Sequence, residues 1–125
     1  MSEKGNISHF AAIFPVRDVV EAAEWYRDNL GFSYEFTWGE PPFYSIVQRD
    51  HGISIHFSKR DGEAEIQPRH LYVFCHDVDA MYEELKDKEL PHLTAPNNAD
   101  YGMRDFEVTD PYGNEITFGT NLDRL

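Results

Sequence analysis

The sequence predicts an α+β fold in which one βαβββ module occurs twice. Two helical segments share one pattern of apolar residues, spaced as on one buried stripe of a helix. Asp18 precedes the first stripe and Asp77 the second, and the two aspartates lie 59 positions apart (77 − 18). The stripes are Val19, Ala22, Ala23 and Tyr26, then Val78, Met81, Tyr82 and Leu85. In addition, each helix follows one apolar-rich segment and precedes three more.

These segments define the order of the elements. Module one is predicted over residues 7–58 and module two over 70–119, joined by a charged connector at 59–69, within a single domain of residues 1–125. The predicted strands are 7–14, 32–38, 43–49 and 52–58, then 70–76, 91–95, 103–109 and 113–119. Gly31 is expected just past the first helix, and Pro91 is expected to stop the second soon after Leu90.

The last strand of each module is expected to follow a turn. Asp110-Pro111-Tyr112-Gly113 has the residues that a type I turn favours, and Asp50-His51-Gly52 takes the same place in module one. Alternation along the strands assigns Phe10 and Phe14, Ile55 and Cys75 to the faces that pack on the helices. Cys75 is therefore expected to be a buried, inert thiol rather than a nucleophile.

Charge and cysteine content narrow the class of partner. The 125 residues carry 23 acidic and 11 basic side chains, a formal net charge of −12. Such a charge disfavours nucleic acid and anionic membranes and favours cationic ligands. Cys75 is the single cysteine, so no intramolecular disulfide can form, and no segment approaches the roughly 18 apolar residues of a membrane span. We therefore expect a cytoplasmic protein without membrane or nucleic-acid partners.

Several short motifs, in this order and spacing, resemble one known superfamily. They are Pro15-Val16-Arg17-Asp18, Leu30-Gly31-Phe32, Gly102-Met103-Arg104-Asp105-Phe106-Glu107 and Asp110-Pro111-Tyr112-Gly113-Asn114. This combination is similar to the glyoxalase, bleomycin-resistance and extradiol-dioxygenase (vicinal oxygen chelate) superfamily, and most of all to bleomycin-resistance proteins. The resemblance implies that the two modules form one cup-shaped sheet, that the chain is a homodimer, and that the cup binds a small organic molecule.

The resemblance also locates four positions where metal-dependent members carry ligands. Here they hold Ala11, His56, His70 and Thr117. Alanine has no donor atom and a threonine hydroxyl is a weak ligand, whereas catalytic sites generally need three good ligands. We therefore expect no metal, no other cofactor and no catalytic residue. His9 and Glu115, two residues from Ala11 and Thr117, are possible substitutes.

The leading hypothesis is a metal-free, dimeric protein that sequesters a cationic or aromatic compound, such as a bleomycin-type antibiotic, by stacking and cation–π contacts. The resemblance assigns aromatic contacts to Phe36, Phe43, Tyr72 and Tyr101, with Trp38 and Tyr44 beside them. The complete predicted ligand-binding set is Phe36, Trp38, Phe43, His56, His70, Tyr72, Tyr101, Glu107, Glu115 and Thr117. The alternative is a metal-dependent lyase, isomerase or dioxygenase that uses His56, His70 and Glu115 or His9. A scaffold module without a small ligand is the third possibility, and the sequence leaves the ligand's identity open.

Overall fold

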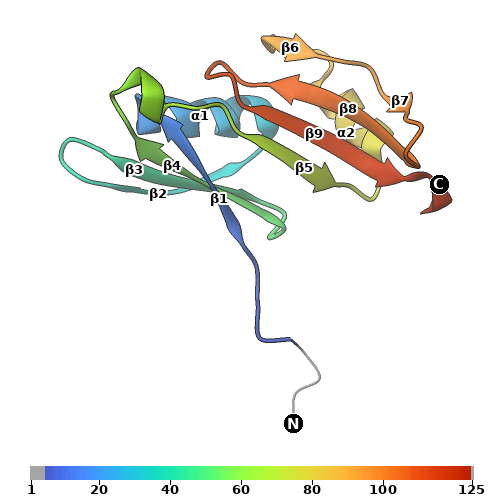
Figure 1. The fold of residues 1–125 in the computed structure, drawn as a ribbon, viewed down its shortest axis with the longest axis horizontal. Helices are drawn as coiled ribbons and strands as arrows, with labels where there is room; N and C mark the ends of the chain where they lie inside the picture. Colours follow the sequence, from blue (N-terminus) through green and yellow to red (C-terminus); the bar gives the residue numbers. More distant parts are fainter. Residues whose placement is uncertain (1–4, 125) are drawn as a thin grey trace. The chain divides into compact units, whose positions relative to one another are not determined.

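The computed structural model describes residues 5–124 and divides into two compact units that meet between Asp61 and Gly62. The boundary falls inside the predicted connector. Each unit holds one α-helix and one sheet, which confirms the α+β class (Figure 1). The first unit has the predicted βαβββ order, and the second has this order with one additional two-residue strand. The combination of both modules into a single cup-shaped domain stays a prediction.

The first unit consists of β1 (Ala11–Val16), α1 (Val19–Leu30), β2 (Ser33–Trp38), β3 (Tyr44–Arg49) and β4 (Ile53–Lys59), with the sheet order β1-β4-β3-β2. β1 pairs with β4 in parallel, and the other neighbours are antiparallel. The prediction that the first strand begins at residue 7 is wrong. Ala11 pairs with Ser54, close to the start of β4, so earlier residues have no strand beside them. Phe10 is accordingly 66% exposed rather than packed on the helix.

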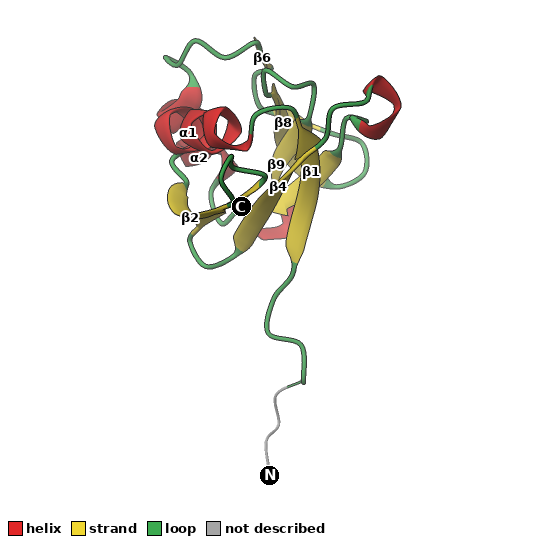
Figure 2. Cartoon of the chain, turned by 90° about the vertical axis from the view of Figure 1, so that its left-hand side faces the viewer, coloured by secondary structure: helices red, strands yellow, loops and turns green. Residues whose placement is uncertain are grey.

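The helix α1 covers one face of this sheet (Figure 2). The Asp18 carboxylate caps its N-terminus by accepting hydrogen bonds from the backbone N–H groups of Val20 and Glu21. Gly31 follows its last residue, as expected, in a left-handed conformation with φ 72°. Tyr26, fully buried, is the centre of the core, with ring centroids 5.1 Å from Phe57 and 5.5 Å from Phe32.

The second unit begins with a single 3₁₀ turn, η1 (Glu63–Glu65), in the predicted connector. It continues with β5 (His70–Phe74), α2 (Val78–Leu85), β6 (His92–Leu93), β7 (Asn97–Asn98), β8 (Met103–Thr109), β9 (Glu115–Asn121) and η2 (Leu122–Arg124). The sheet order is β5-β9-β8-β6, and β7 also pairs with β8. β5 ends earlier than predicted, so Cys75 follows the strand and is half-buried rather than buried.

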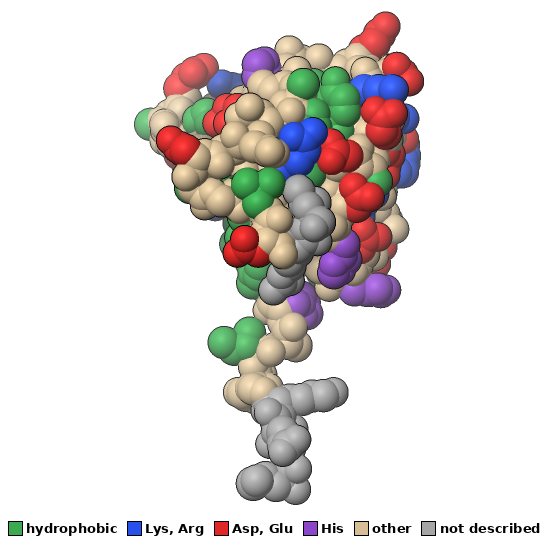
Figure 3. All heavy atoms as spheres, turned by 90° about the vertical axis from the view of Figure 1, so that its right-hand side faces the viewer, with side chains coloured by type: hydrophobic (Ala, Val, Ile, Leu, Met, Phe, Trp, Pro, Cys, Tyr) green, Lys and Arg blue, Asp and Glu red, His purple; other side chains and the backbone are tan. Residues whose placement is uncertain are grey.

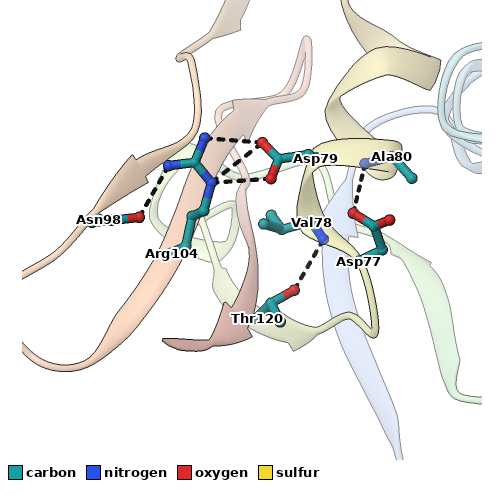
Figure 4. Close-up of polar contacts among 7 residues, drawn as sticks. All are labelled: Asp77, Val78, Asp79, Ala80, Asn98, Arg104 and Thr120. Atoms are coloured by element: carbon teal, nitrogen blue, oxygen red, sulfur yellow. Dashed lines mark hydrogen bonds and ion pairs between the residues drawn. The ribbon is translucent and has the colours of Figure 1, made fainter. Parts of the chain in front are cut away.

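Polar contacts hold the start of α2 against β8 and β9 (Figure 4). The Asp77 carboxylate accepts a hydrogen bond of 3.0 Å from the N–H of Ala80. The buried Thr120 hydroxyl accepts one of 2.9 Å from the N–H of Val78. Arg104 donates through two nitrogens to the Asp79 carboxylate, at 3.0 to 3.3 Å. The helix ends at Leu85, five residues before the predicted end at Leu90, because its buried stripe stops there.

The predicted turn before β9 is built around a buried aspartate. The Asp110 carboxylate accepts hydrogen bonds of 2.8 Å from the N–H groups of Tyr112 and Asn114, and Gly113 has φ 89°. The other predicted turn joins β3 to β4, with positive φ at Asp50 and His51. Along residues 5–124, no helix is both long and apolar enough to cross a membrane.

Candidate functional site

The first sheet has one face against α1 and an opposite face that carries no helix, here called the first open face. Register places Ile13, His56, Ile46 and Phe36 side by side across its four strands. Ile13 is 55% and Phe36 50% exposed, whereas Ile55 and Val47, on the helix side, are fully buried. Exposed apolar side chains gathered on one face are typical of a binding surface.

Four rings on this face form a chain of contacts, here called the aromatic row: Phe36, Trp38, Tyr44 and His56. Successive ring centroids lie 4.2, 5.8 and 5.4 Å apart. The Tyr44 hydroxyl lies 2.8 Å from Nδ1 of His56, and burial lowers the pKa of that imidazole from its usual 6.5. The row therefore presents π surfaces and an imidazole that stays neutral at physiological pH.

The structure places Phe43 outside this row. It lies just before β3 and is 55% exposed, so it does not pack in the core. Its ring lies against Gly39, where a Cβ atom would come within 2.6 Å of the ring carbon Cε2. Phe43 thus belongs to the β2–β3 loop, and no ring contact joins it to the aromatic row.

A depression of about 380 Å³ lies in the first unit and includes none of the ten predicted site residues. It combines the β3–β4 turn with the segment before β1, and its lining residues are His9, Phe10, Glu35, Ile46, Gln48, His51, Gly52, Ile53 and Ser54. Alternation along β3 and β4 could have indicated Ile46, Gln48 and Ser54. The β3–β4 turn and the segment before β1 have no alternating pattern, so the sequence could not have indicated the lining residues that they contribute.

The second sheet also has a face opposite its helix, here called the second open face. Nε2 of His70 lies 2.9 Å from Oγ1 of the buried Thr117. Glu115 is the register partner of His70, and Glu107 is the partner of Thr117. These four predicted site residues are therefore neighbours on β5, β9 and β8.

Tyr72 and Tyr101 meet at a carboxylate outside the predicted ligand-binding set, that of Asp105. The Tyr72 hydroxyl donates to Oδ2 of Asp105 over 2.8 Å, and the Tyr101 hydroxyl donates to the same oxygen in a short hydrogen bond. Burial and then the bond to Asp105 raise the pKa of Tyr72. Asp105 lies two residues before Glu107 on β8, so alternation along this strand could have indicated it as a neighbour of Glu107 on the same face.

Acidic groups dominate the second open face. Its alternating positions on β5, β8 and β9 include the carboxylates of Asp105, Glu107 and Glu115, and include no lysine or arginine. Arg104 points to the other face, where it pairs with Asp79. Acidic side chains are also spread over the face of the molecule drawn in Figure 3, with smaller basic groups among them. This charge distribution favours a cationic ligand.

The predicted site residues thus form two sets. Phe36, Trp38, Phe43 and His56 belong to the first unit, and the other six belong to the second. Among the described residues, no group of three or more His, Cys, Asp or Glu side chains is arranged to hold a metal ion. Ala11 is exposed and, as expected, offers no donor beside Ser54.

Comparison with known proteins gives one family. The family model described as the Glyoxalase/Bleomycin resistance protein/Dioxygenase superfamily matches residues 6–118. No sequence among the curated proteins matches significantly.

Several solved structures share the fold. The bleomycin-binding protein of Streptomyces verticillus, in complex with copper(II)-bleomycin, has 24% identity and a TM-score of 0.73, and the match covers 92% of this chain and 97% of that one. The bleomycin resistance determinant encoded on transposon Tn5 has 20% identity and a TM-score of 0.77, covering 92% and 98%. TioX from Micromonospora sp. ML1 has 16% identity and a TM-score of 0.76, covering 92% and 99%.

Proposed function

Because the chain belongs to the glyoxalase, bleomycin resistance protein and dioxygenase superfamily, we propose that it binds and sequesters a small cationic or aromatic organic molecule. The protein acts in this proposal without a metal, as a homodimer in the cytoplasm. In this proposal each open face is a binding surface in its own right. A bleomycin-type antibiotic is the first ligand to test, because two of the similar structures are bleomycin-binding proteins in complex with that drug.

The observation that carries the proposal is the combination of aromatic rings and unpaired carboxylates on the second open face; the first open face offers rings alone. The aromatic row offers faces on which a flat ligand can stack. On the second open face, the carboxylates of Glu107 and Glu115 have no hydrogen-bond partner among the described residues. The rings of Tyr72 and Tyr101 lie on the same second open face, and rings beside free carboxylates fit a planar cation.

The predicted roles of individual residues form part of this proposal. Phe36, Trp38 and Phe43 contact apolar parts of the ligand, with His56 as a polar contact in the first unit. In the second unit, Tyr72 and Tyr101 stack on the ligand, Glu107 and Glu115 supply charge, and His70 with Thr117 supplies hydrogen bonds.

The metal-dependent alternative has less support. His70 and Glu115 are adjacent, but Nε2 of His70 is engaged with the Thr117 hydroxyl, which is a weak metal ligand. An enzyme of this kind would need His56, or a shift of His9, to complete the ligand set.

Isothermal titration calorimetry tests the proposal directly. The probes are bleomycin and a panel of planar heteroaromatic cations, each paired with a neutral molecule of similar shape. We expect saturable binding of at least one cation and weaker binding of its neutral counterpart. Absence of binding by every cation at millimolar concentration would overturn the proposal. Sedimentation analysis of the same sample tests the dimer.

A further inference from the structure

We propose that Asp105 binds the charged N–H group of an organic cation through Oδ1, and that Tyr72, Tyr101 and Gly119 hold this carboxylate and its flanking rings in position. The inference rests on the proposed function and deepens it. It names a carboxylate outside the predicted site and a chemical class of ligand, the planar amidinium or guanidinium.

The first argument is the uneven use of the two carboxylate oxygens. Both tyrosine hydroxyls donate to Oδ2, and Oδ1 accepts no hydrogen bond from any described residue. An ionised carboxylate can accept at both oxygens. Oδ1 is therefore the acceptor left for a ligand, and a cationic N–H donor forms the stronger, charge-assisted bond there.

The second argument is the path that Tyr72 takes to reach Asp105. β9 lies between β5 and β8, and Gly119 is the register partner of both Phe74 and Asp105. The Tyr72 side chain crosses β9 at Gly119, where an added Cβ would lie 2.8 Å from Cζ and 2.9 Å from Cε1, and closer still to the hydroxyl oxygen. Gly119 does not have a positive φ, so space for the Tyr72 ring, rather than backbone conformation, requires glycine here.

The third argument is the charge around the tyrosines. Burial and the bond to Asp105 raise the pKa of Tyr72, and the bond to Asp105 raises that of Tyr101, so both phenols stay protonated and keep donating at physiological pH. Neutral rings beside a carboxylate attract a cation through their π faces. No lysine or arginine occupies the alternating open-face positions of β5, β8 and β9 to compete for Asp105.

The ligand must therefore satisfy three conditions: a positive charge, a flat π system and an N–H donor on the charged group. Benzamidinium has all three, neutral benzamide lacks the charge, and phenyltrimethylammonium lacks the N–H donor. These three molecules are the probes. If cation–π attraction alone held the ligand, phenyltrimethylammonium would bind as well as benzamidinium. A hydrogen bond to Oδ1 of Asp105 is possible only for benzamidinium, because it alone has both the charge and the N–H donor.

The test is calorimetric titration of the wild type and three variants with these probes. Asp105→Asn removes the charge at nearly constant size, and Gly119→Ala displaces Tyr72 without changing charge. Asp87→Asn, an exposed position after α2, is the control for loss of one negative charge. We expect Asp105→Asn and Gly119→Ala each to weaken benzamidinium binding by about tenfold or more, and Asp87→Asn by less than about twofold.

A second measurement separates positioning from general damage to the fold. Near-ultraviolet titration of tyrosinate follows the phenols without any ligand, and Asp105→Asn should lower the pH at which the most resistant tyrosine ionises. In a Tyr72→Ala background, Gly119→Ala should have no further effect on binding, because the ring that it would displace is gone.

The outcomes distinguish this inference from the proposed function. If benzamidinium and other cations fail to bind the wild type, both are overturned. If benzamidinium binds the wild type and Asp105→Asn with equal affinity, or if phenyltrimethylammonium binds as tightly as benzamidinium, the role of Asp105 is overturned while capture of a cation stands.

Discussion

Nε2 of His70 lies 2.9 Å from Oγ1 of Thr117, so two of the four positions where the family resemblance led us to look for metal ligands hydrogen-bond to each other. The hydroxyl is neutral and weakly coordinating near pH 7, and the equivalent first-strand position in the other module is Ala11. We therefore propose that this pair is a polar contact within the sheet rather than half of a metal site.

We accordingly expect purified protein to hold far less than one divalent ion per chain, and its affinity for an organic cation to be unchanged by a chelator. Elemental analysis and calorimetry with and without EDTA provide the measurement. One tightly held nickel, zinc, manganese or iron ion per chain, lost in a His70→Ala variant, would favour the enzyme instead.

The contribution of His56 to stability depends on pH, because burial lowers the pKa of its imidazole from 6.5. The unfolded chain then binds a proton more readily than the folded chain, so this group's contribution to stability is present above pH 6.5 and is lost as pH falls through the folded pKa. Two-dimensional NMR should show the His56 ring titrating below pH 6.5. Titration of His56 above that value would contradict the burial seen here. Tyr44→Phe serves as a comparison, because it removes the hydroxyl partner of Nδ1.

The end of α2 can be tested by stability. Leu85 is fully buried in the last turn, whereas Leu90 is half-buried and lies beyond the helix. Leu85→Ala should lower the free energy of unfolding by about 2–5 kcal/mol. Leu90→Ala serves as the matched control and should lower the free energy of unfolding by clearly less than Leu85→Ala does. Chemical denaturation followed by circular dichroism measures both, and equal losses would place the true end of the helix near Leu90.

Most of the fold could be predicted from local sequence, because the same pattern of helix and strand residues occurs in both modules. The apolar stripe of the first helix and the Asp110 turn each have a direct chemical reason and form as predicted. In the second stripe Val78 and Leu85 are buried, whereas Met81 and Tyr82 are half-buried. The wrong predictions concern the ends of strands and helices and the short strands, because pairing with neighbouring strands determines where these elements begin and end. Residues before Ala11 lie beyond the start of β4, so no strand pairs with them, and the two-residue strand β7 is too short to show any period.

The site was less predictable because its members are defined by contacts. Alternation correctly assigned His56 and Tyr72 to the faces away from the helices, but it cannot show that Tyr72 crosses β9 to reach Asp105. Tyr72 can take that path because glycine at position 119 has no side chain, and an alternating pattern of apolar residues does not reveal this. Phe43 directly precedes β3 and was predicted as part of that strand. It lies in the β2–β3 loop instead, and the loop determines where its ring lies.

Trp38 is the ring in the aromatic row with the largest π surface, and it contacts both Phe36 and Tyr44. If the row stacks on a cationic aromatic ligand, Trp38→Leu should weaken its binding by about 3- to 30-fold, which is the range for a cation–π contact at partly exposed sites. Trp25→Phe is the control, because Trp25 lies on α1 and packs against Tyr26 instead. Binding should also quench the fluorescence of the wild type and of Trp25→Phe, in which Trp38 is the remaining tryptophan. Unchanged affinity in Trp38→Leu, with full quenching retained through Trp25, would exclude the first open face from the binding surface.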